Sequence, residues 1–145
     1  MKKLTHPIIW ITGQSGSGKT TLAIALKKNV GGIILDGDEM RNTISTDLGF
    51  NKNDRERHNL RIAKLAKTIS RDVLVIISVI APFKSTRSLI NKIIKPIWVY
   101  MENDKIKISK EKPYEIPVKY DVKVNFYRQN TNEQVELIKK ILLNK

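Results

Sequence analysis

The segment that most constrains this chain is residues 13–20, GQSGSGKT. It fits the pattern G-x-x-x-x-G-K-[ST], in which the backbone N–H groups of a glycine-rich turn converge on phosphate oxygens. The preceding residues, PIIWIT, predict a buried strand, and the following residues, TLAIALKK, predict a helix. This order places the positive end of a helix at the phosphates. The segment therefore predicts a site for the phosphate tail of a nucleotide.

Residues of this loop have distinct expected roles. Lys19 is expected to reach the β- and γ-phosphates, and the Thr20 hydroxyl is expected to bind Mg²⁺. Glycine allows the backbone to curl tightly enough for its amides to face one ligand. The residues expected to contact the triphosphate are Gly13, Ser15, Gly16, Ser17, Gly18, Lys19, Thr20 and Thr21.

Composition narrows the class of protein. A length of 145 residues predicts one domain, residues 1–145, and the absence of cysteine excludes disulfides and thiolate zinc sites. No stretch reaches transmembrane length, so a cytoplasmic location is expected. The net charge of +13 is compatible with nucleic acid, with small anionic substrates or with a lysine-rich bias. Because the lysines are spread along the chain, we favour small anions plus bias, and expect no nucleic-acid or membrane partner.

Apolar runs alternate with helical patterns along the chain. This alternation predicts an α/β protein with a three-layer P-loop NTPase (nucleotide kinase-like) fold and a central parallel sheet. The helix over 54–70 is expected to have Asn53 or Asp54 as its N-cap, and a capping box is expected over 131–134. The expected strands cover residues 7–12, 33–35, 72–80, 96–101 and 122–126.

Two aspartates follow the second predicted strand. Asp36 and Asp38 lie where the carboxyl ends of parallel strands meet, beside the phosphate loop. A carboxylate there can accept a proton from an attacking hydroxyl or hold Mg²⁺ through water. Asp38 is equally suited to cap the helix that follows it. We favour catalysis for Asp38 more strongly than for Asp36.

Three later motifs follow the two aspartates at fixed intervals: DGDEMR at 36–41, DLGF at 47–50 and DR at 54–55. They resemble D-G-D-N-x-R, D-L-G-F and D-R-x-E-N-x-R-R of the adenylylsulfate (APS) kinase family, with the same intervals. IAPFKSTR at 80–87 and PYEIP at 113–117 are similar to I-S-P-Y-R-x-x-R and P-Y-E-A-P. The resemblance implies transfer of the ATP γ-phosphoryl to the 3′-hydroxyl of a nucleotide acceptor.

The resemblance also implies roles for individual residues. Lys19, Asp38 and Asp36 would be catalytic, and Phe50 would stack on the acceptor base. The alternatives are surface ion pairs for the arginines, a core position for Phe50 and solvated positions for His58 and Lys84. The residues that would bind the acceptor are Arg41, Phe50, Arg55, His58, Asn59, Ala81 and Lys84.

The chain departs from the family mainly on the acceptor side. His58 stands where the family has asparagine, and Leu60 and Ala81 replace an arginine and a serine. The family's long lid is missing, and residues 105–112 form either a shortened lid or, as we favour, a solvated loop. Three hypotheses follow: an APS kinase; the same chemistry on another modified nucleotide such as cytidine diphosphoramidate; or a non-catalytic nucleotide-binding protein. A homodimer is compatible with each.

Overall fold

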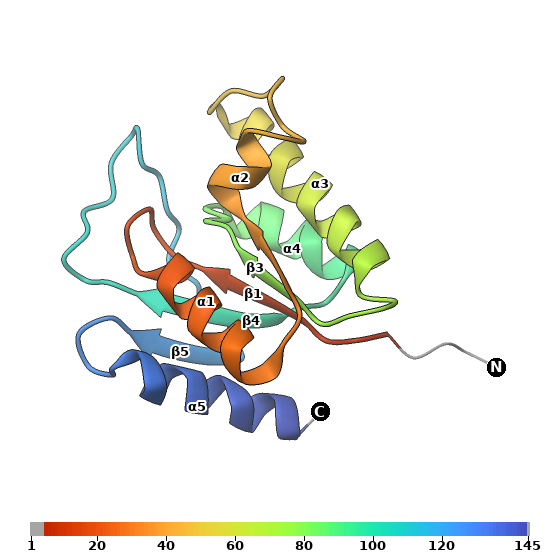
Figure 1. Cartoon of the computed structure of the whole chain (residues 1–145). Helices are drawn as coiled ribbons and strands as arrows, with labels where there is room; N and C mark the ends of the chain where they lie inside the picture. The colour runs from red at the N-terminus through yellow and green to blue at the C-terminus, as the bar shows by residue number, and fades with distance from the viewer. Residues whose placement is uncertain (1–4, 145) are drawn as a thin grey trace.

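The computed structural model describes residues 5–144, which form a five-stranded parallel sheet flanked by helices (Figure 1). The strands lie side by side in the order β2-β3-β1-β4-β5, and each neighbouring pair is parallel. This arrangement confirms the predicted three-layer P-loop NTPase fold. The strands are β1 (Ile8–Thr12), β2 (Ile33–Asp36), β3 (Val75–Ser78), β4 (Ile97–Glu102) and β5 (Val122–Asn125).

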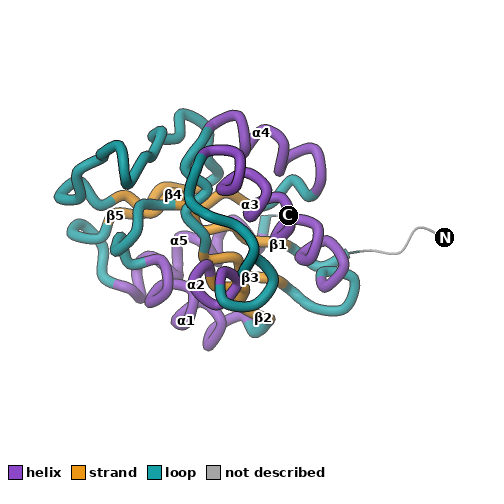
Figure 2. Tube along the Cα trace, turned by 90° about the horizontal axis from the view of Figure 1, so that it is seen from above, coloured by secondary structure: helices purple, strands orange, loops and turns teal. Residues whose placement is uncertain are grey.

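Helices cover both faces of the sheet because strand side chains alternate between the two faces. One apolar cluster joins the sheet to α3 and α4, and a second joins it to α1 and α5. Figure 2 shows these two pairs on opposite sides of the strands. The short α2 follows β2 directly at the carboxyl edge of the sheet. The helices are α1 (Lys19–Val30), α2 (Gly37–Arg41), α3 (Lys52–Ile69), α4 (Lys84–Ile93) and α5 (Thr131–Leu143).

The central strand β1 anchors the phosphate loop in the core. All five of its residues are buried, and the Trp10 ring lies 5.4 Å from the Trp98 ring between their centroids. The Trp10 indole Nε1 donates to the carbonyl oxygen of Val79 at 3.0 Å, so its polar group is satisfied within the core. A fully buried strand thus leads directly into residues 13–18.

Several helix ends differ from the expected positions. Asn51, rather than Asn53 or Asp54, caps α3 by accepting from the Asp54 amide at 2.8 Å. The capping box of α5 is formed by Asn130 and Glu133, one residue earlier than expected. In both cases an asparagine precedes the first helical residue, and its short amide side chain reaches the third amide of the helix. Boundaries inferred from periodicity alone miss this by one or more residues.

A long segment connects β4 to β5. Residues 103–121 contain no helix or strand and project beyond the carboxyl edge of the sheet (Figure 1). Within residues 5–144, no helix is long and apolar enough to cross a membrane.

Candidate active site

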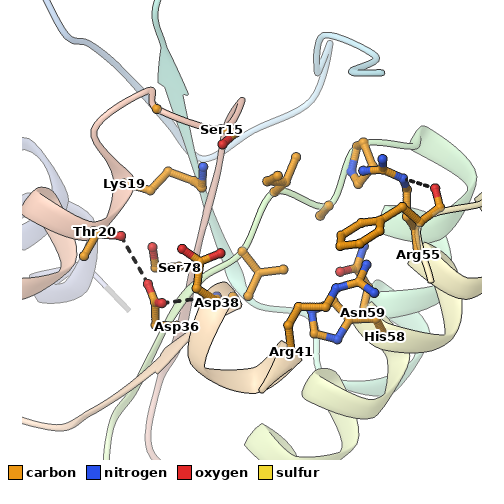
Figure 3. A pocket seen from close by; sticks show the side chains of 17 residues that line it. Ser15, Lys19, Thr20, Asp36, Asp38, Arg41, Arg55, His58, Asn59 and Ser78 are labelled. Carbon is orange, nitrogen blue, oxygen red and sulfur yellow. Dashed lines mark hydrogen bonds between the residues drawn. The ribbon is translucent and has the colours of Figure 1, made fainter. Parts of the chain in front are cut away.

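A cavity of about 170 Å³ opens at the carboxyl ends of β1, β2 and β3 (Figure 3). The phosphate loop and the first turn of α1 form one side, and α2, α3 and the segment after β3 form the other. This edge is where open parallel sheets bind their ligands. The lining residues are Ser15, Gly16, Lys19, Thr20, Asp36, Gly37, Asp38, Arg41, Phe50, Arg55, His58, Asn59, Ser78, Val79, Ile80, Ala81 and Pro82.

The phosphate loop requires glycine at two positions. A Cβ atom on Gly13 would lie 2.7 Å from the Met101 carbonyl oxygen, so this position accommodates no side chain. Gly18 has φ +104° as the N-cap of α1, a left-handed conformation that disfavours other residues. The loop is closed by a hydrogen bond from the Ser17 amide to the Gln14 carbonyl at 3.0 Å. Its curled backbone has the form that a phosphate cradle needs.

Lys19 lies buried at the base of this loop. Its Nζ donates to the Gln14 carbonyl oxygen at 2.8 Å. Burial lowers the pKa of Lys19 to about 8, although Asp36 and Asp38 oppose this shift by stabilising the charged amine. Desolvation therefore outweighs the two carboxylates. A bound triphosphate would supply negative charge beside this buried amine and so stabilise its protonated form.

The two aspartates predicted after β2 have different surroundings. Asp36 caps α2 by accepting from the amides of Asp38 and Glu39, at 3.2 and 3.4 Å, and it also accepts from Thr20 Oγ1 at 3.1 Å. The capping role considered for Asp38 thus belongs to Asp36. Asp38 lies in the first turn of α2, and its carboxylate points into the cavity on the side of Lys19 (Figure 3). It is therefore the carboxylate that is placed to meet a ligand.

Phe50 and two arginines form the opposite part of the cavity. The Phe50 side chain is 67% exposed, which contradicts a core position. The Arg41 and Arg55 guanidinium carbons lie 4.4 and 5.5 Å from the ring centroid. Arg41 donates to the Gly49 carbonyl at 2.6 Å and Arg55 donates to the Phe50 carbonyl, so both hold the loop that carries the ring. Two guanidinium groups next to one exposed aromatic ring form a surface for an anionic ligand with a planar base.

These arginines repel each other electrostatically. The pKa of Arg41 is lowered first by burial and then by the charge of Arg55, and burial also lowers the pKa of Arg55. Both groups remain charged because arginine titrates far above neutral pH. A bound anion would relieve this repulsion. The arginines are thus not simple surface ion pairs.

His58 and Asn59 form a neutral floor beneath the arginines (Figure 3). Both are buried, so the solvated position considered for His58 is wrong. His58 Nδ1 shares a hydrogen bond with Ser45 Oγ at 2.8 Å. Burial, followed by the charges of Arg41 and Arg61, lowers the pKa of His58 to about 4, so its ring is neutral at pH 7. Within the described part of the chain, Asn59 Nδ2 has no hydrogen-bond partner.

Of the two remaining predicted acceptor residues, Ala81 lies at the cavity and Lys84 does not. Ala81 lines the cavity in a left-handed conformation, with φ 48°. Lys84 instead begins α4, outside the cavity lining, and its backbone amide donates to Glu115 Oε1 at 2.8 Å. The same helix directs Arg87 inward, where its guanidinium binds the carbonyls of Ala81 and Glu115, both at 2.6 Å.

Ser78 was not predicted from the sequence. It ends β3 opposite Asp36 in the sheet and lines the cavity. Its buried Oγ has no hydrogen-bond partner among residues 5–144, which is costly unless a ligand or water supplies one. Its position at the carboxyl end of a predicted strand was the available signal, but the apolar run continued past it and obscured that end.

The segment 105–112, which we expected to be solvated, contacts both sides of the site. Gln14 Nε2 donates to the Ile106 carbonyl at 3.3 Å, and Arg55 Nη2 donates to the Glu111 carbonyl at 3.2 Å. The lysines of the segment are exposed. The expectation of a solvated loop therefore holds for these side chains but not for the backbone.

Comparison with known proteins identifies the family. Residues 5–139 match the family model for adenylylsulphate kinase. A "Probable adenylyl-sulfate kinase" of Pyrococcus abyssi is 34% identical, over 90% of this chain and 91% of that protein. An adenylyl-sulfate kinase of Prochlorococcus marinus is 42% identical over 70% of this chain, but this match spans only 50% of that protein.

Solved structures share the fold. The Mycobacterium tuberculosis APS kinase CysC, in complex with AMPPNP and APS, superposes with a TM-score of 0.84 at 23% identity, covering 95% of this chain and 98% of that one. A Cys556Ala mutant of the same enzyme has a TM-score of 0.80 at 26% identity, over 95% and 97% of the two chains. From its motifs, its fold and these matches, the chain belongs to the adenylylsulphate kinase family.

Proposed function

We propose that this chain is an ATP-dependent kinase that transfers the γ-phosphoryl group to the 3′-hydroxyl of adenylylsulfate. The observation that carries the proposal is the position of Asp38, between the phosphate loop and the surface formed by Phe50, Arg41 and Arg55. Family membership supports the same reaction and favours adenylylsulfate over the other two hypotheses.

On the donor side, the phosphate loop would bind the ATP triphosphate. Lys19 would gain full charge as the phosphates replace lost solvation, and would stabilise the charge that moves onto the leaving ADP. Thr20 and Asp36 supply hydroxyl and carboxylate oxygens, the donors that Mg²⁺ accepts together with phosphate oxygens. When bound there, Mg²⁺ would neutralise the β- and γ-phosphates. Residues 5–144 contain no cluster of three acidic, histidine or cysteine side chains. Mg²⁺ at this site would therefore take its remaining ligands from phosphate oxygens and water.

On the acceptor side, the phosphosulfate group carries the charge that Arg41 and Arg55 would bind. Phe50 would stack on the base, and His58 and Asn59 would donate to or accept from its polar groups. Asp38 would accept the proton of the 3′-hydroxyl. At the same time the 3′-oxygen would form a bond to the γ-phosphorus, and the bond between that phosphorus and ADP would break. Positioning and charge neutralisation supply most of the acceleration in such transfers.

The test is to incubate the protein with Mg-ATP and single acceptors: adenylylsulfate, cytidine diphosphoramidate, AMP or none. Mass spectrometry and phosphorus NMR would then locate any new phosphate. ADP and a 3′-phosphate formed only with adenylylsulfate support the proposal. Turnover only with another nucleotide selects the second hypothesis, and ATP binding without turnover selects the third.

Two variants localise the chemistry. Asp38→Asn is expected to lower kcat by about 100-fold or more while ATP still binds, because the amide cannot accept the proton. Glu39→Gln is the matched control, since the neighbouring Glu39 does not line the cavity. Lys19→Ala is expected to abolish tight ATP binding. Equal activity of Asp38→Asn and Glu39→Gln would contradict the assignment of Asp38.

Three coarser expectations accompany this function. Residues 1–145 would act as one kinase domain because one sheet carries both subsites. A cytoplasmic location is also proposed, and it is compatible with the use of ATP as donor. A homodimer is also proposed, and light scattering coupled to gel filtration would test it. A neighbouring solved structure, the APS kinase of Thiobacillus denitrificans, is described as hexameric, and the match covers 29% of that chain.

A further inference from the structure

The segment after β3 forms one wall of the acceptor cavity, and each of its carbonyl groups is held from outside the segment. We call residues 79–82 the acceptor wall. The Trp10 indole donates to the Val79 carbonyl at 3.0 Å, Thr12 Oγ1 to the Ile80 carbonyl at 2.5 Å, and Arg87 Nη1 to the Ala81 carbonyl at 2.6 Å. The fourth carbonyl, of Pro82, accepts from the Glu115 amide at 2.8 Å.

This support fixes an otherwise unfavourable backbone. Ala81 has φ 48°, which costs roughly 1–2 kcal/mol for a residue with a Cβ atom. In a trans peptide the N–H of one residue points opposite to the carbonyl of the residue before it. Because the carbonyls of Val79 and Ile80 bind Trp10 and Thr12, the amides of Ile80 and Ala81 are directed away from those partners. The shape of the wall is therefore set by the groups behind it.

Tyr114 completes the support from the far end of the long β4–β5 segment. Its hydroxyl lies 3.0 Å from Thr12 Oγ1, and the side chain is buried. Thr12 has one hydroxyl proton, which the Ile80 carbonyl receives, so Tyr114 must be the donor to Thr12. Burial raises the pKa of Tyr114 to about 12, which keeps this proton in place at neutral pH. The hydrogen bonds thus run from Tyr114 through Thr12 to Ile80.

Arg87 joins the same network. Its guanidinium carbon lies 5.6 Å from the Tyr114 ring centroid, and its two terminal nitrogens bind the Ala81 and Glu115 carbonyls. Arg87 is 8% exposed, so it is a buried link and not a ligand on the cavity surface. Residues 114–115 thus connect to three carbonyls of the acceptor wall: directly to Pro82, through Arg87 to Ala81, and through Thr12 to Ile80. Thr12 itself is held as the last residue of the buried strand β1, so loss of the Tyr114 hydroxyl alone leaves the adjoining donor loop in place.

We propose that Tyr114 and Arg87 are positioning residues that set the acceptor wall and hence acceptor affinity, with Thr12 as the connecting hydroxyl. The inference rests on the proposed function. This positioning role differs from a purely structural one. Loss of the Tyr114 hydroxyl leaves its ring packed against Tyr100, 6.2 Å away between centroids, so the fold should persist. The effect should fall on the acceptor and not on ATP.

The test compares Tyr114→Phe with Tyr100→Phe, which removes a hydroxyl from the adjacent stacked ring. Tyr114→Phe is expected to raise the KM for adenylylsulfate about fivefold, the equivalent of one lost hydrogen bond, with the KM for ATP unchanged within twofold. Tyr100→Phe is expected to leave both within twofold. A similar rise in both KM values for Tyr114→Phe, or no rise in either, would overturn the positioning role.

Thr12 variants test the connection. Thr12→Val removes both hydrogen bonds, so adding Tyr114→Phe to it is expected to raise the acceptor KM no further, whereas Thr12→Ser should restore it. Fully additive effects would show that Tyr114 acts by another route. The melting temperature of each variant reports whether the fold itself has changed.

Hydrogen exchange separates this inference from the proposed function. The amide of Glu115, next to Tyr114, donates to the Pro82 carbonyl at 2.8 Å. In Tyr114→Phe this amide is expected to exchange faster than in the wild type, whether or not the acceptor is adenylylsulfate. Unchanged exchange would overturn the positioning role. Absence of adenylylsulfate turnover in the wild-type protein would instead overturn the proposed function alone.

Discussion

Thr20 Oγ1 donates a hydrogen bond to Asp36 Oδ1 across 3.1 Å, joining the first turn of α1 to the end of β2. The same aspartate caps α2, the helix that carries Asp38. One carboxylate therefore links the donor loop to the helix that presents the proposed base. A group that bound both Thr20 Oγ1 and the Asp36 carboxylate, such as Mg²⁺ with phosphates, would therefore also hold α2 in a fixed orientation.

Thr20→Val is expected to reduce kcat/KM by about 100-fold, because the Mg²⁺ proposed to bind here and the Asp36 carboxylate would both lose a hydroxyl partner. Thr20→Ser should retain most activity, since it keeps the oxygen. Thr68→Val, on the exposed far end of α3, is the control. Steady-state assays across a range of Mg²⁺ concentrations give the measurement, and wild-type activity in Thr20→Val would exclude a role in metal binding.

Phe50→Ala is expected to raise the KM for the acceptor by about tenfold or more, because stacking on an aromatic ring contributes about 1–3 kcal/mol per base. Stability should change by less than about 0.5 kcal/mol, since the side chain is mostly exposed. Leu143→Ala, which removes an exposed apolar side chain from α5, is the control. If Phe50→Ala lowered stability without changing the acceptor KM, the role of Phe50 would be structural and the stacking role would be wrong.

ATP affinity is expected to fall as the pH rises above about 8, because Lys19 loses its proton there in the ligand-free protein. If only the charged amine binds, the apparent dissociation constant approaches a tenfold increase per pH unit. Lys19→Arg should bind more weakly but without this dependence, because arginine stays charged. Isothermal titration between pH 7 and 9.5 measures both, and parallel curves would show that Lys19 is not the titrating group.

Acid should destabilise the fold through His58. Its pKa is about 4 in the folded chain and 6.5 when unperturbed, so between these values the unfolded state binds more protons. The free energy of unfolding therefore decreases as the pH falls from 6.5 to 4. Urea denaturation of the wild type and His58→Gln across this range tests it, and the variant should lack this part of the decrease. Ser45, Arg41 and Arg61 are the groups that face or act on the ring.

Gly13→Ala is expected to abolish tight ATP binding, because the added Cβ would press on the Met101 carbonyl and on Ser17 Oγ. Gly31→Ala makes a useful comparison. Gly31 also has a positive φ, but a Cβ there meets nothing within 4 Å. That variant should lose roughly 1 kcal/mol of stability and retain nucleotide affinity. Equal loss of binding in both would point to global destabilisation and not to the loop.

The sequence was most informative where one residue type is required by geometry. The glycine pattern at 13–20 predicted the donor side, and the apolar run before it and the helix formers after it predicted β1 and α1. The inward face of α3 was predicted less well. Its buried face includes His58 and Asn59 at the cavity, which were indicated only by the resemblance to a known family. Polar residues that face a site carry no hydrophobic signal, so periodicity cannot find them.

The β4–β5 segment was the least predictable part. Its lysine-rich composition favoured a solvated loop, and the lysines are indeed exposed. Its contacts with Gln14 and Arg55 are made through backbone carbonyls, which every residue possesses. The side-chain sequence therefore gives no signal for these contacts. The same is true of the hydrogen bonds to the carbonyls of the acceptor wall.

The two halves of the cavity come from separate stretches of chain. The donor cradle is built from residues 13–20, whereas the acceptor surface is built mainly from residues 41–59 and 78–82. Substitutions within residues 41–59 and 78–82 can therefore reshape the acceptor surface while the residues of the donor cradle keep their identity. At the level of sequence, the choice of acceptor and the grip on the donor are separable traits.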